Sequence, residues 1–207
     1  MPVAIEPTGD AFRELWPEAR VTNLLDDSLA PDLAAVGAIT PAMVERFVTM
    51  TRYCVSCGAN AVLFTCSAFG TAIDEAKRSV KVPVLKPNEA MMEETLAAGS
   101  HVALLTTFEP SIPSLMAELE QLASDRGIKL RIKTRNIPAA IKALQQGQGA
   151  EHDRLIAAAA AEMGTCDALV LGQFSMARAA AGIPAKAGRK VLTSPHSAVV
   201  RLRQMFR

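Results

Sequence analysis

The sequence repeats one pattern at Asn60-Ala61-Val62-Leu63-Phe64-Thr65-Cys66 and Asp167-Ala168-Leu169-Val170-Leu171-Gly172-Gln173, an offset of 107 residues (173 − 66). Each run is a short aliphatic stretch, which is typical of a strand buried in a parallel sheet. Cys66 and Gln173 then fall at equivalent strand ends. Any function must therefore account for a thiol in one half of the chain and an amide in the other.

The same offset relates two further pairs of segments. Val84-Leu85 falls on Val191-Leu192, and Val21 to Leu25 falls on Ile128 to Ile132. Aliphatic runs alternate with helical patterns along the chain, which predicts parallel strands joined by crossover helices in an α/β fold. We expect an N-terminal lobe over residues 1–98 and a C-terminal lobe over residues 99–207, with the last helix packing back on the first lobe.

The hydrophobic pattern assigns the individual elements. Strands are predicted at residues 21–25, 61–65, 82–85, 102–106, 128–132, 168–171 and 191–193. Helices are predicted at residues 10–16, 41–57, 71–80, 88–98, 114–126, 139–145, 150–163, 175–181 and 197–205.

The repeat also predicts a missing strand. Val102 to Thr106 opens the second half, and its counterpart would lie before Met1. We expect the first lobe to have one strand fewer than the second. Either Val3-Ala4-Ile5 pairs into the vacancy as a short substitute, a neighbouring subunit supplies a strand, or the sequence begins downstream of the natural start.

Composition narrows the class of function. Lys and Arg number 22 against 21 Asp and Glu, and aromatic residues make up only 4% of the chain, so the basic, aromatic surface of a nucleic-acid binder is absent. No apolar run approaches the ~18 residues that cross a bilayer, and the N-terminal residues lack the basic start of a signal peptide. We expect a cytoplasmic protein with a small-molecule partner, no nucleic acid and no membrane.

The cysteines and histidines do not form a recognisable metal or disulfide pattern. Cys54-Val55-Ser56-Cys57 lies late in a predicted helix, so we interpret this pair as packed helix cysteines, and no metal is expected. His101, His152 and His196 are expected to be surface or capping residues. Among the three histidines, His196 is the best candidate for a functional role, because the 107-residue offset aligns it with Glu89.

Cys66 is the strongest candidate for chemistry. It ends an aliphatic run and precedes Ser67-Ala68-Phe69-Gly70, where a helix is predicted to begin. Free amides and the positive end of a helix dipole favour bound anions and also stabilise a thiolate. The alternative is an inert cysteine buried in the core.

Four stretches together resemble the aspartate/glutamate/hydantoin racemase superfamily, which includes maleate cis-trans isomerase and arylmalonate decarboxylase. They are Phe64-Thr65-Cys66-Ser67-Ala68-Phe69-Gly70, Val84-Leu85-Lys86-Pro87-Asn88-Glu89-Ala90, Leu104-Leu105-Thr106-Thr107 and Asp167-Ala168-Leu169-Val170-Leu171-Gly172. The resemblance extends from Phe12 onward. It implies two pseudo-symmetric Rossmann-like lobes with a site in the cleft between them, chemistry without cofactor or metal, and a homo-oligomer.

The resemblance also implies roles for particular residues. Cys66 matches the catalytic cysteine of the first half, with the Ser67 hydroxyl and the Ala68 amide as donors to a substrate carboxylate. Thr106 or Thr107 matches a carboxylate-binding threonine. Gln173 stands where the family has its second cysteine, and we interpret Gln173, Phe174 and Ser175 as a donor and pocket wall.

The glutamine at this position argues against racemisation by two thiols, because an amide neither gives nor takes a proton near neutral pH. Chemistry that needs one thiol remains, with Cys66 as base or nucleophile acting on a small carboxylate such as an amino acid, a dicarboxylate or a hydantoin-like compound. The alternatives are a decarboxylase of a malonate-type acid and an inactive member that binds a small acid.

Overall fold

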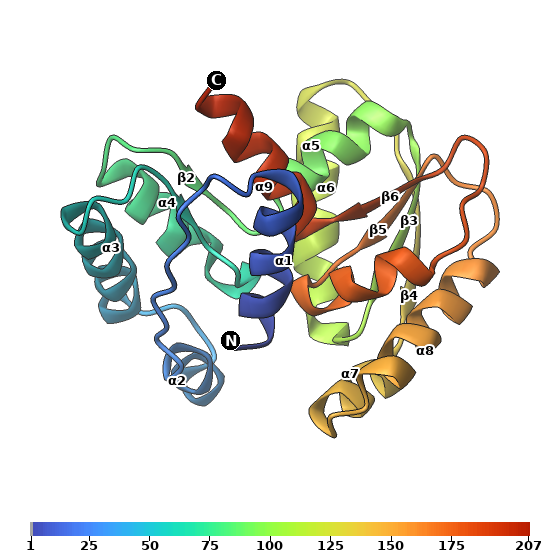
Figure 1. Ribbon diagram of the computed structural model, residues 1–207, viewed down its shortest axis with the longest axis horizontal. Coiled ribbons are helices and arrows are strands. Elements are labelled where there is room, and N and C mark those ends of the chain that lie inside the picture. The colour runs from blue at the N-terminus through green and yellow to red at the C-terminus, as the bar shows by residue number, and fades with distance from the viewer. Residues whose placement is uncertain (1) are drawn as a thin grey trace. The chain divides into compact units, whose positions relative to one another are not determined.

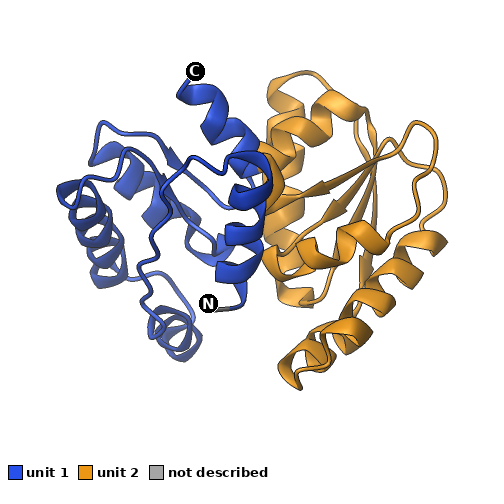
Figure 2. Cartoon of the chain, viewed as in Figure 1, with its two compact units in different colours: residues 1–89, 198–207 blue, residues 90–197 orange. Residues whose placement is uncertain are grey.

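The computed structural model describes residues 2–207 and contains two parallel sheets (Figure 1). One is four-stranded in the order β4-β3-β5-β6, and the other is two-stranded, β1-β2. The sheets belong to two units: residues 2–89 with 198–207 form unit 1, and residues 90–197 form unit 2 (Figure 2). The α/β class with parallel sheets is confirmed.

Unit 2 alternates strands with helices. Its elements in chain order are α5 (Glu89–Ala98), β3 (His101–Thr106), the 3-10 turn η3 (Glu109–Ser111), α6 (Ile112–Asp125), β4 (Arg131–Asn136), α7 (Pro138–Gln145), α8 (Gly149–Glu162), β5 (Ala168–Leu171), the 3-10 segment η4 (Phe174–Gly182), β6 (Lys190–Thr193) and α9 (Ser194–Met205). Helix α5 starts on the last residue of unit 1, and the end of α9 belongs to unit 1.

The central strands of unit 2 are buried on both faces. On β3, Ala103 and Leu105 face a core built with α7, α8 and η4, whereas Val102 and Leu104 face a second core built with α5 and α6. This follows from the strand period of two, which sends successive side chains to opposite faces. An uninterrupted aliphatic run is therefore the signature of this strand, as the sequence predicts.

The sequence predicts that the edge strand β4 begins at Ile128. In the structure it begins three residues later, at Arg131. The chain first closes helix α6: Gly127 has a left-handed φ of 66° and the N–H of Ile128 donates to the carbonyl of Ala123 at 2.9 Å. This hydrogen bond is part of a Schellman motif, which keeps Ile128 out of the ladder. His101 of β3 then pairs with Arg131 as the first partner.

The amino-terminal end of this sheet is fixed by one carboxylate. Asp167 accepts hydrogen bonds from the backbone N–H groups of Ser100 and His101, both at 2.9 Å. These bonds, the one from His101 first, lower the pKa of Asp167. Gly99 has a φ of 151°, and a Cβ there would overlap the Asp167 carboxylate, so the approach requires glycine.

Unit 1 has helical segments at equivalent positions but a smaller sheet. Its elements are η1 (Pro2–Ala4), α1 (Ile5–Leu15), α2 (Leu29–Val36), α3 (Pro41–Ser56), β1 (Val62–Leu63), η2 (Ser67–Phe69), α4 (Gly70–Arg78) and β2 (Val84–Leu85). Helix α3 begins where the sequence predicts, with Pro41 in its first turn and the Thr40 hydroxyl accepting from the Met43 N–H at 3.2 Å.

The 107-residue repeat is present in the structure. Val62 pairs with Val84, and their counterparts at the same offset, Leu169 and Val191, also pair. The offset relates helices as well: η1 matches η3, α1 starts at the position equivalent to the start of α6, and α3 matches α8 within one residue. The two units are therefore copies of one plan.

Two strand predictions in the first half are wrong. Val3-Ala4-Ile5 does not form a strand, because Pro2–Ala4 is the 3-10 turn equivalent to Glu109–Ser111 and leads into a helix. Val21–Leu25 is also outside any strand. In unit 2 the equivalent strand β4 pairs only with β3, and unit 1 has no counterpart of β3 within residues 2–207 that could pair with Val21–Leu25.

The first half thus has two strands in its described part, against the three that the sequence predicts. Helix α2 was not among the predicted elements, and the helix predicted at residues 10–16 begins at Ile5 instead. The remaining predicted helices are present with shifted ends, although the predicted helix at residues 175–181 is a 3-10 segment.

Candidate functional site

Cys66 lies just beyond the carboxyl end of β1. Its backbone is extended, with φ −125° and ψ 118°, and the chain then turns directly into η2 and α4. The side chains of Cys66 and Ser67 are half-buried, and Ala68 is exposed. The thiol therefore stands beside the first N–H groups of a helical segment, which lack partners within their own helix and can bind an anion.

The other three cysteines lie in different settings. All four thiols are free, and Cys57 is exposed at the end of α3. Burial raises the pKa of Cys54 and of Cys166, which disfavours their thiolates. Among residues 2–207, no three His, Cys, Asp or Glu side chains are grouped to hold a metal ion.

Gln173 lies at the equivalent strand end in unit 2, and both the oxygen and the nitrogen of its amide form hydrogen bonds. Its Oε1 accepts from the backbone N–H of Thr107 at 2.8 Å, and its Nε2 donates to the Ser111 hydroxyl at 2.7 Å. The Thr107 hydroxyl also approaches Oε1, at 3.4 Å. Gln173 thus ties the loop after β3 to the loop after β5.

The neighbouring residues of this cluster are nearly all buried. Thr106 donates from its hydroxyl to Asn136 Oδ1 at 3.2 Å, which joins the ends of β3 and β4. Phe174 and Ser175 are each only 5% exposed at the start of η4. The structure therefore brings Thr107 and Gln173 together, and it adds Ser111, which the sequence did not single out because its role depends on a contact 62 residues away.

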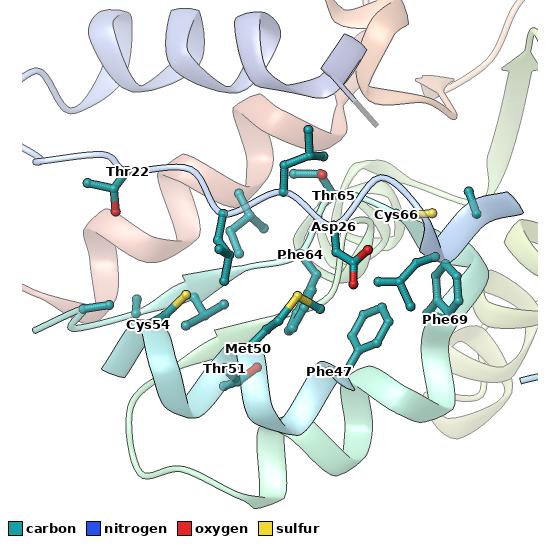
Figure 3. Close-up of a pocket in the computed structure, with 18 residues that line it drawn as sticks. Thr22, Asp26, Phe47, Met50, Thr51, Cys54, Phe64, Thr65, Cys66 and Phe69 are labelled. Atoms are coloured by element: carbon teal, nitrogen blue, oxygen red, sulfur yellow. The ribbon is translucent and has the colours of Figure 1, made fainter. Parts of the chain in front are cut away.

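A cavity of about 210 Å³ lies in unit 1 beside the same strand as Cys66 (Figure 3). Its walls come from residues 61–66 of β1 and its ends, from α3, and from the segment between Thr22 and Ala30. Cys66 and Phe69 lie at one end of the lining and Cys54 at the other (Figure 3). The cavity is smaller than the ~300–1,000 Å³ of typical ligand pockets.

The sequence of the chain matches the family model of the Asp/Glu/hydantoin racemases over residues 17–202. The chain belongs to this racemase family. The resemblance stated from the sequence is therefore confirmed. Among proteins of curated function, none matches the sequence significantly.

Solved structures of racemases and of a decarboxylase share the fold of this chain. Glutamate racemase from Thermus thermophilus, in complex with β-chloro-D-alanine, is 20% identical with a TM-score of 0.63, covering 99% of this chain and 77% of that one. An aspartate racemase homologue from Pyrococcus horikoshii is 16% identical with a TM-score of 0.65, covering 99% and 94%. Arylmalonate decarboxylase is 18% identical with a TM-score of 0.57, covering 78% and 76%. At these identities the similarity shows the fold.

The histidines of this racemase-family chain differ from expectation at one position. His152 is completely buried in α8, with Nδ1 2.7 Å from Asp153 Oδ1, so the prediction of a surface or capping residue is wrong there. It lies on the same helical face as the buried Ile156 and Ala160. His196 is exposed, and its counterpart Glu89 pairs with Lys77 at 3.0 Å.

The helices give one further result. None of those in the described part of the chain is both long and apolar enough to cross a membrane. The catalytic role of Cys66 stays a prediction, as do the substrate-binding roles of Ser67, Ala68, Thr106, Thr107, Phe174 and Ser175.

Proposed function

We propose that this racemase-family chain is a cofactor-independent enzyme that acts on a small carboxylate through a single thiol, that of Cys66. The observation that carries the proposal is the contrast between the two equivalent strand ends. One presents a half-buried thiol at a helix start, and the other presents an amide held by Thr107 and Ser111. Only the first can exchange a proton or attack carbon near neutral pH.

The proposal assigns the remaining roles by chemistry. The Ser67 hydroxyl and the Ala68 N–H bind a carboxylate oxygen of the substrate beside the thiol, since the start of a helical segment attracts anions. In the second half of the chain, Thr107, Phe174 and Ser175 form polar and apolar parts of the wall of the substrate pocket. Gln173 keeps the Thr107 loop in place through its two hydrogen bonds and takes no proton.

A single thiol limits the reactions that are possible. As a base, the Cys66 thiolate removes a proton from the carbon next to a carboxylate and returns a solvent-derived proton to the same face of the enediolate, which exchanges the hydrogen and keeps the configuration. As a nucleophile, it adds to the double bond of a maleate-type acid, allows rotation about the resulting single bond, and leaves again. Neither route requires an acid on the opposite face.

The decisive experiment is a screen for hydrogen exchange at carbon. Amino acids, dicarboxylates and hydantoins are incubated with the protein in D₂O at about pH 7 and followed by NMR. If Cys66 acts as a base, we expect deuterium to enter one enantiomer faster than racemisation occurs. If it acts as a nucleophile, we expect cis-trans isomerisation of an unsaturated diacid. Deuterium delivered during loss of CO₂ from a malonate-type acid would identify the decarboxylase alternative.

Cysteine variants test the assignment of the thiol. Cys66→Ser should lower the rate about 10²–10⁴-fold, because a hydroxyl is far less acidic than a thiol. Cys166→Ser is the matched control and should keep the rate. A Cys66→Ser rate within about tenfold of the parent, a barrier change of about 1.4 kcal/mol, would remove Cys66 from the chemistry. Binding of acids without turnover would favour the inactive alternative.

A further inference from the structure

The end of helix α3 places two free thiols on one helical turn. Cys54 lies in the last turn, and Cys57 caps the helix three positions later. Residues three apart lie on the same side of a helix, with Cβ atoms about 5–6 Å apart. Cys54 is half-buried and Cys57 is exposed, so a reagent in solution reaches Cys57 first. The proposed chemistry of Cys66 makes no use of this Cys-x-x-Cys pair.

The other two thiols lie elsewhere. Cys66 and Cys54 lie at opposite ends of the lining of the unit 1 cavity (Figure 3). Cys166 belongs to unit 2. Cys57 is therefore the thiol that shares a turn with Cys54.

The backbone holds this pair within the span of a disulfide. The N–H of Cys57 donates to the carbonyl of Cys54 at 3.2 Å and to that of Tyr53 at 3.0 Å. A turn that returns from residue i+3 to residue i keeps its two Cα atoms less than about 7 Å apart, and disulfides join Cα atoms about 4.4–6.8 Å apart. Disulfides also need Cβ atoms about 3.5–4.5 Å apart, so the two side chains must approach by about 1–2 Å.

The last turn of α3 can supply this movement. Cys57 has φ −81° and ψ 5°, and its N–H is shared between an α-type bond to Tyr53 and a 3-10-type bond to Cys54. In a 3-10 turn the side chains at i and i+3 are in line. If the bond to Tyr53 is released, the N–H of Cys57 still has its partner in Cys54. Beyond the pair, Gly58 has φ 89° and the N–H of Ala59 donates to the carbonyl of Cys54 at 3.0 Å, which anchors the turn.

The side chains of this turn also influence one another. Burial raises the pKa of the Cys54 thiol, and negative charge on Cys57 raises it further. A hydrogen bond with the Cys57 side chain raises the pKa of Tyr53. The carboxyl end of a helix carries the negative end of its dipole, which disfavours a thiolate. Since a disulfide is a strong oxidant when its reduced form is stabilised, this pair is suited to being oxidised and not to oxidising other proteins.

We propose that Cys54 and Cys57 are a redox-active pair that closes to a disulfide by exchange with a low-molecular-weight disulfide such as oxidised glutathione. The Cys57 thiolate attacks one sulfur of the oxidant, forms a mixed disulfide and displaces one glutathione as its thiolate. The Cys54 thiolate then attacks the Cys57 sulfur and displaces the other glutathione. The two cysteines lose two protons and two electrons, and the oxidant is reduced to two molecules of glutathione thiol.

The test treats the full chain with oxidised glutathione at about millimolar concentration, alkylates the remaining thiols and maps the peptides by mass spectrometry. We expect a chain that has lost two hydrogen atoms, with Cys54 joined to Cys57 and with Cys66 and Cys166 alkylated. Dithiothreitol should restore the parent mass. Cys166→Ser is the matched control and should close at the parent rate.

Two single variants test the order of attack. Cys54→Ser should stop at a mixed disulfide between glutathione and Cys57. Cys57→Ser should take up glutathione at Cys54 at least about tenfold more slowly, because Cys54 is half-buried. In concentrated urea the burial is lost, so the two rates should agree within about twofold. The difference between folded and unfolded chain separates the effect of the turn from that of the local sequence.

Four results would overturn the proposal. One is the absence of any reaction at Cys54 and Cys57. Another is a parent chain that keeps glutathione on Cys57, which would show that the turn does not close. The third is a disulfide from Cys57 to Cys66 or to a second chain. The fourth is equal rates for the two single variants in the folded chain, which would remove Cys57 as the first thiol to react.

Discussion

Unit 1 and unit 2 are built on one repeat, yet within residues 2–207 the first holds two strands and the second holds four. The difference begins with β3, which is at most 2% exposed from Val102 to Leu105 and pairs on both edges. Unit 1 has no counterpart of this strand in the part that is described. Its remaining sheet is only two residue pairs long.

The consequence extends to a second segment. Val21–Leu25 has the aliphatic residues of a strand, but no strand among residues 2–207 pairs with it, and it is exposed. Backbone N–H and C=O groups need partners, so a strand forms only where another strand already lies. The presence of one central strand therefore also determines whether the neighbouring segment forms a strand.

The largest expected effect concerns the cores around equivalent strands. Leu169 on β5 is fully buried, whereas its counterpart Val62 on β1 is half-buried. Leu169→Ala should lower the free energy of unfolding by about 2–5 kcal/mol. Val62→Ala should cost about 1 kcal/mol or less, because less apolar area is lost from the core.

Urea unfolding can follow both variants. Trp16 is the only tryptophan of the chain and lies in unit 1, so its fluorescence reports on that unit while circular dichroism reports on both. Equal losses for Leu169→Ala and Val62→Ala would contradict the comparison, since they would make the small sheet as tightly packed as the large one.

A smaller effect is expected at the strand ends. Gln173→Ala leaves the N–H of Thr107, a residue only 2% exposed, without its acceptor and should cost about 1–3 kcal/mol. Cys66 caps none of the amides of η2, so Cys66→Ala should cost less than about 1 kcal/mol. Urea midpoints of the two variants check this. A costlier Cys66→Ala would mean that the thiol supports the fold as well as the proposed chemistry.

The smallest expected effect is a change in stability that appears only at acidic pH. The N–H groups of His101 and Ser100 lower the pKa of Asp167 in the folded state, while the equivalent residue in unit 1 is Asn60. A lowered folded pKa contributes stability above the unfolded value of about 3.9, and this contribution is lost as pH falls through the folded pKa. Asp167→Asn should therefore flatten the loss of unit 2 stability in acid.

Urea unfolding at about pH 7 and about pH 3, followed by circular dichroism, measures this difference. Glu120→Gln, at an exposed position of α6, is the matched control and should unfold like the parent at both pH values. An acid dependence that is unchanged in Asp167→Asn would show that other groups control it.

Much of the fold can be predicted from the sequence because aliphatic runs and helix starts are local signals. The strand at residues 168–171 follows from the repeat itself, whereas the pairing of Leu169 with Val191 comes from the structure. Helix α3 follows from Thr40 and Pro41 at its start. The start of β4 is not predictable in this way, because the Schellman motif at Ala123 uses the backbone of Ile128 first.

The residues of the candidate site likewise differ in whether a local sequence pattern reveals them. Cys66 is recognisable because a cysteine that ends an aliphatic run before a helix start is a local pattern. Ser111 is not, since its role comes from a hydrogen bond to Gln173, far along the chain. His152 is misjudged because its polarity suggests the surface, whereas Asp153 allows it to be buried in the face shared with Ile156.

By itself, the sequence determined the two-copy plan, the parallel α/β class, the family and the contrast between Cys66 and Gln173, all of which are written in residue order. The tertiary structure decided which aliphatic segments become strands and which polar groups hold one another. The physical reason is that a strand or a buried polar group is stable only with a partner. Those partners, β3 for β4 and Gln173 for Thr107, are distant in sequence and meet only when the chain folds.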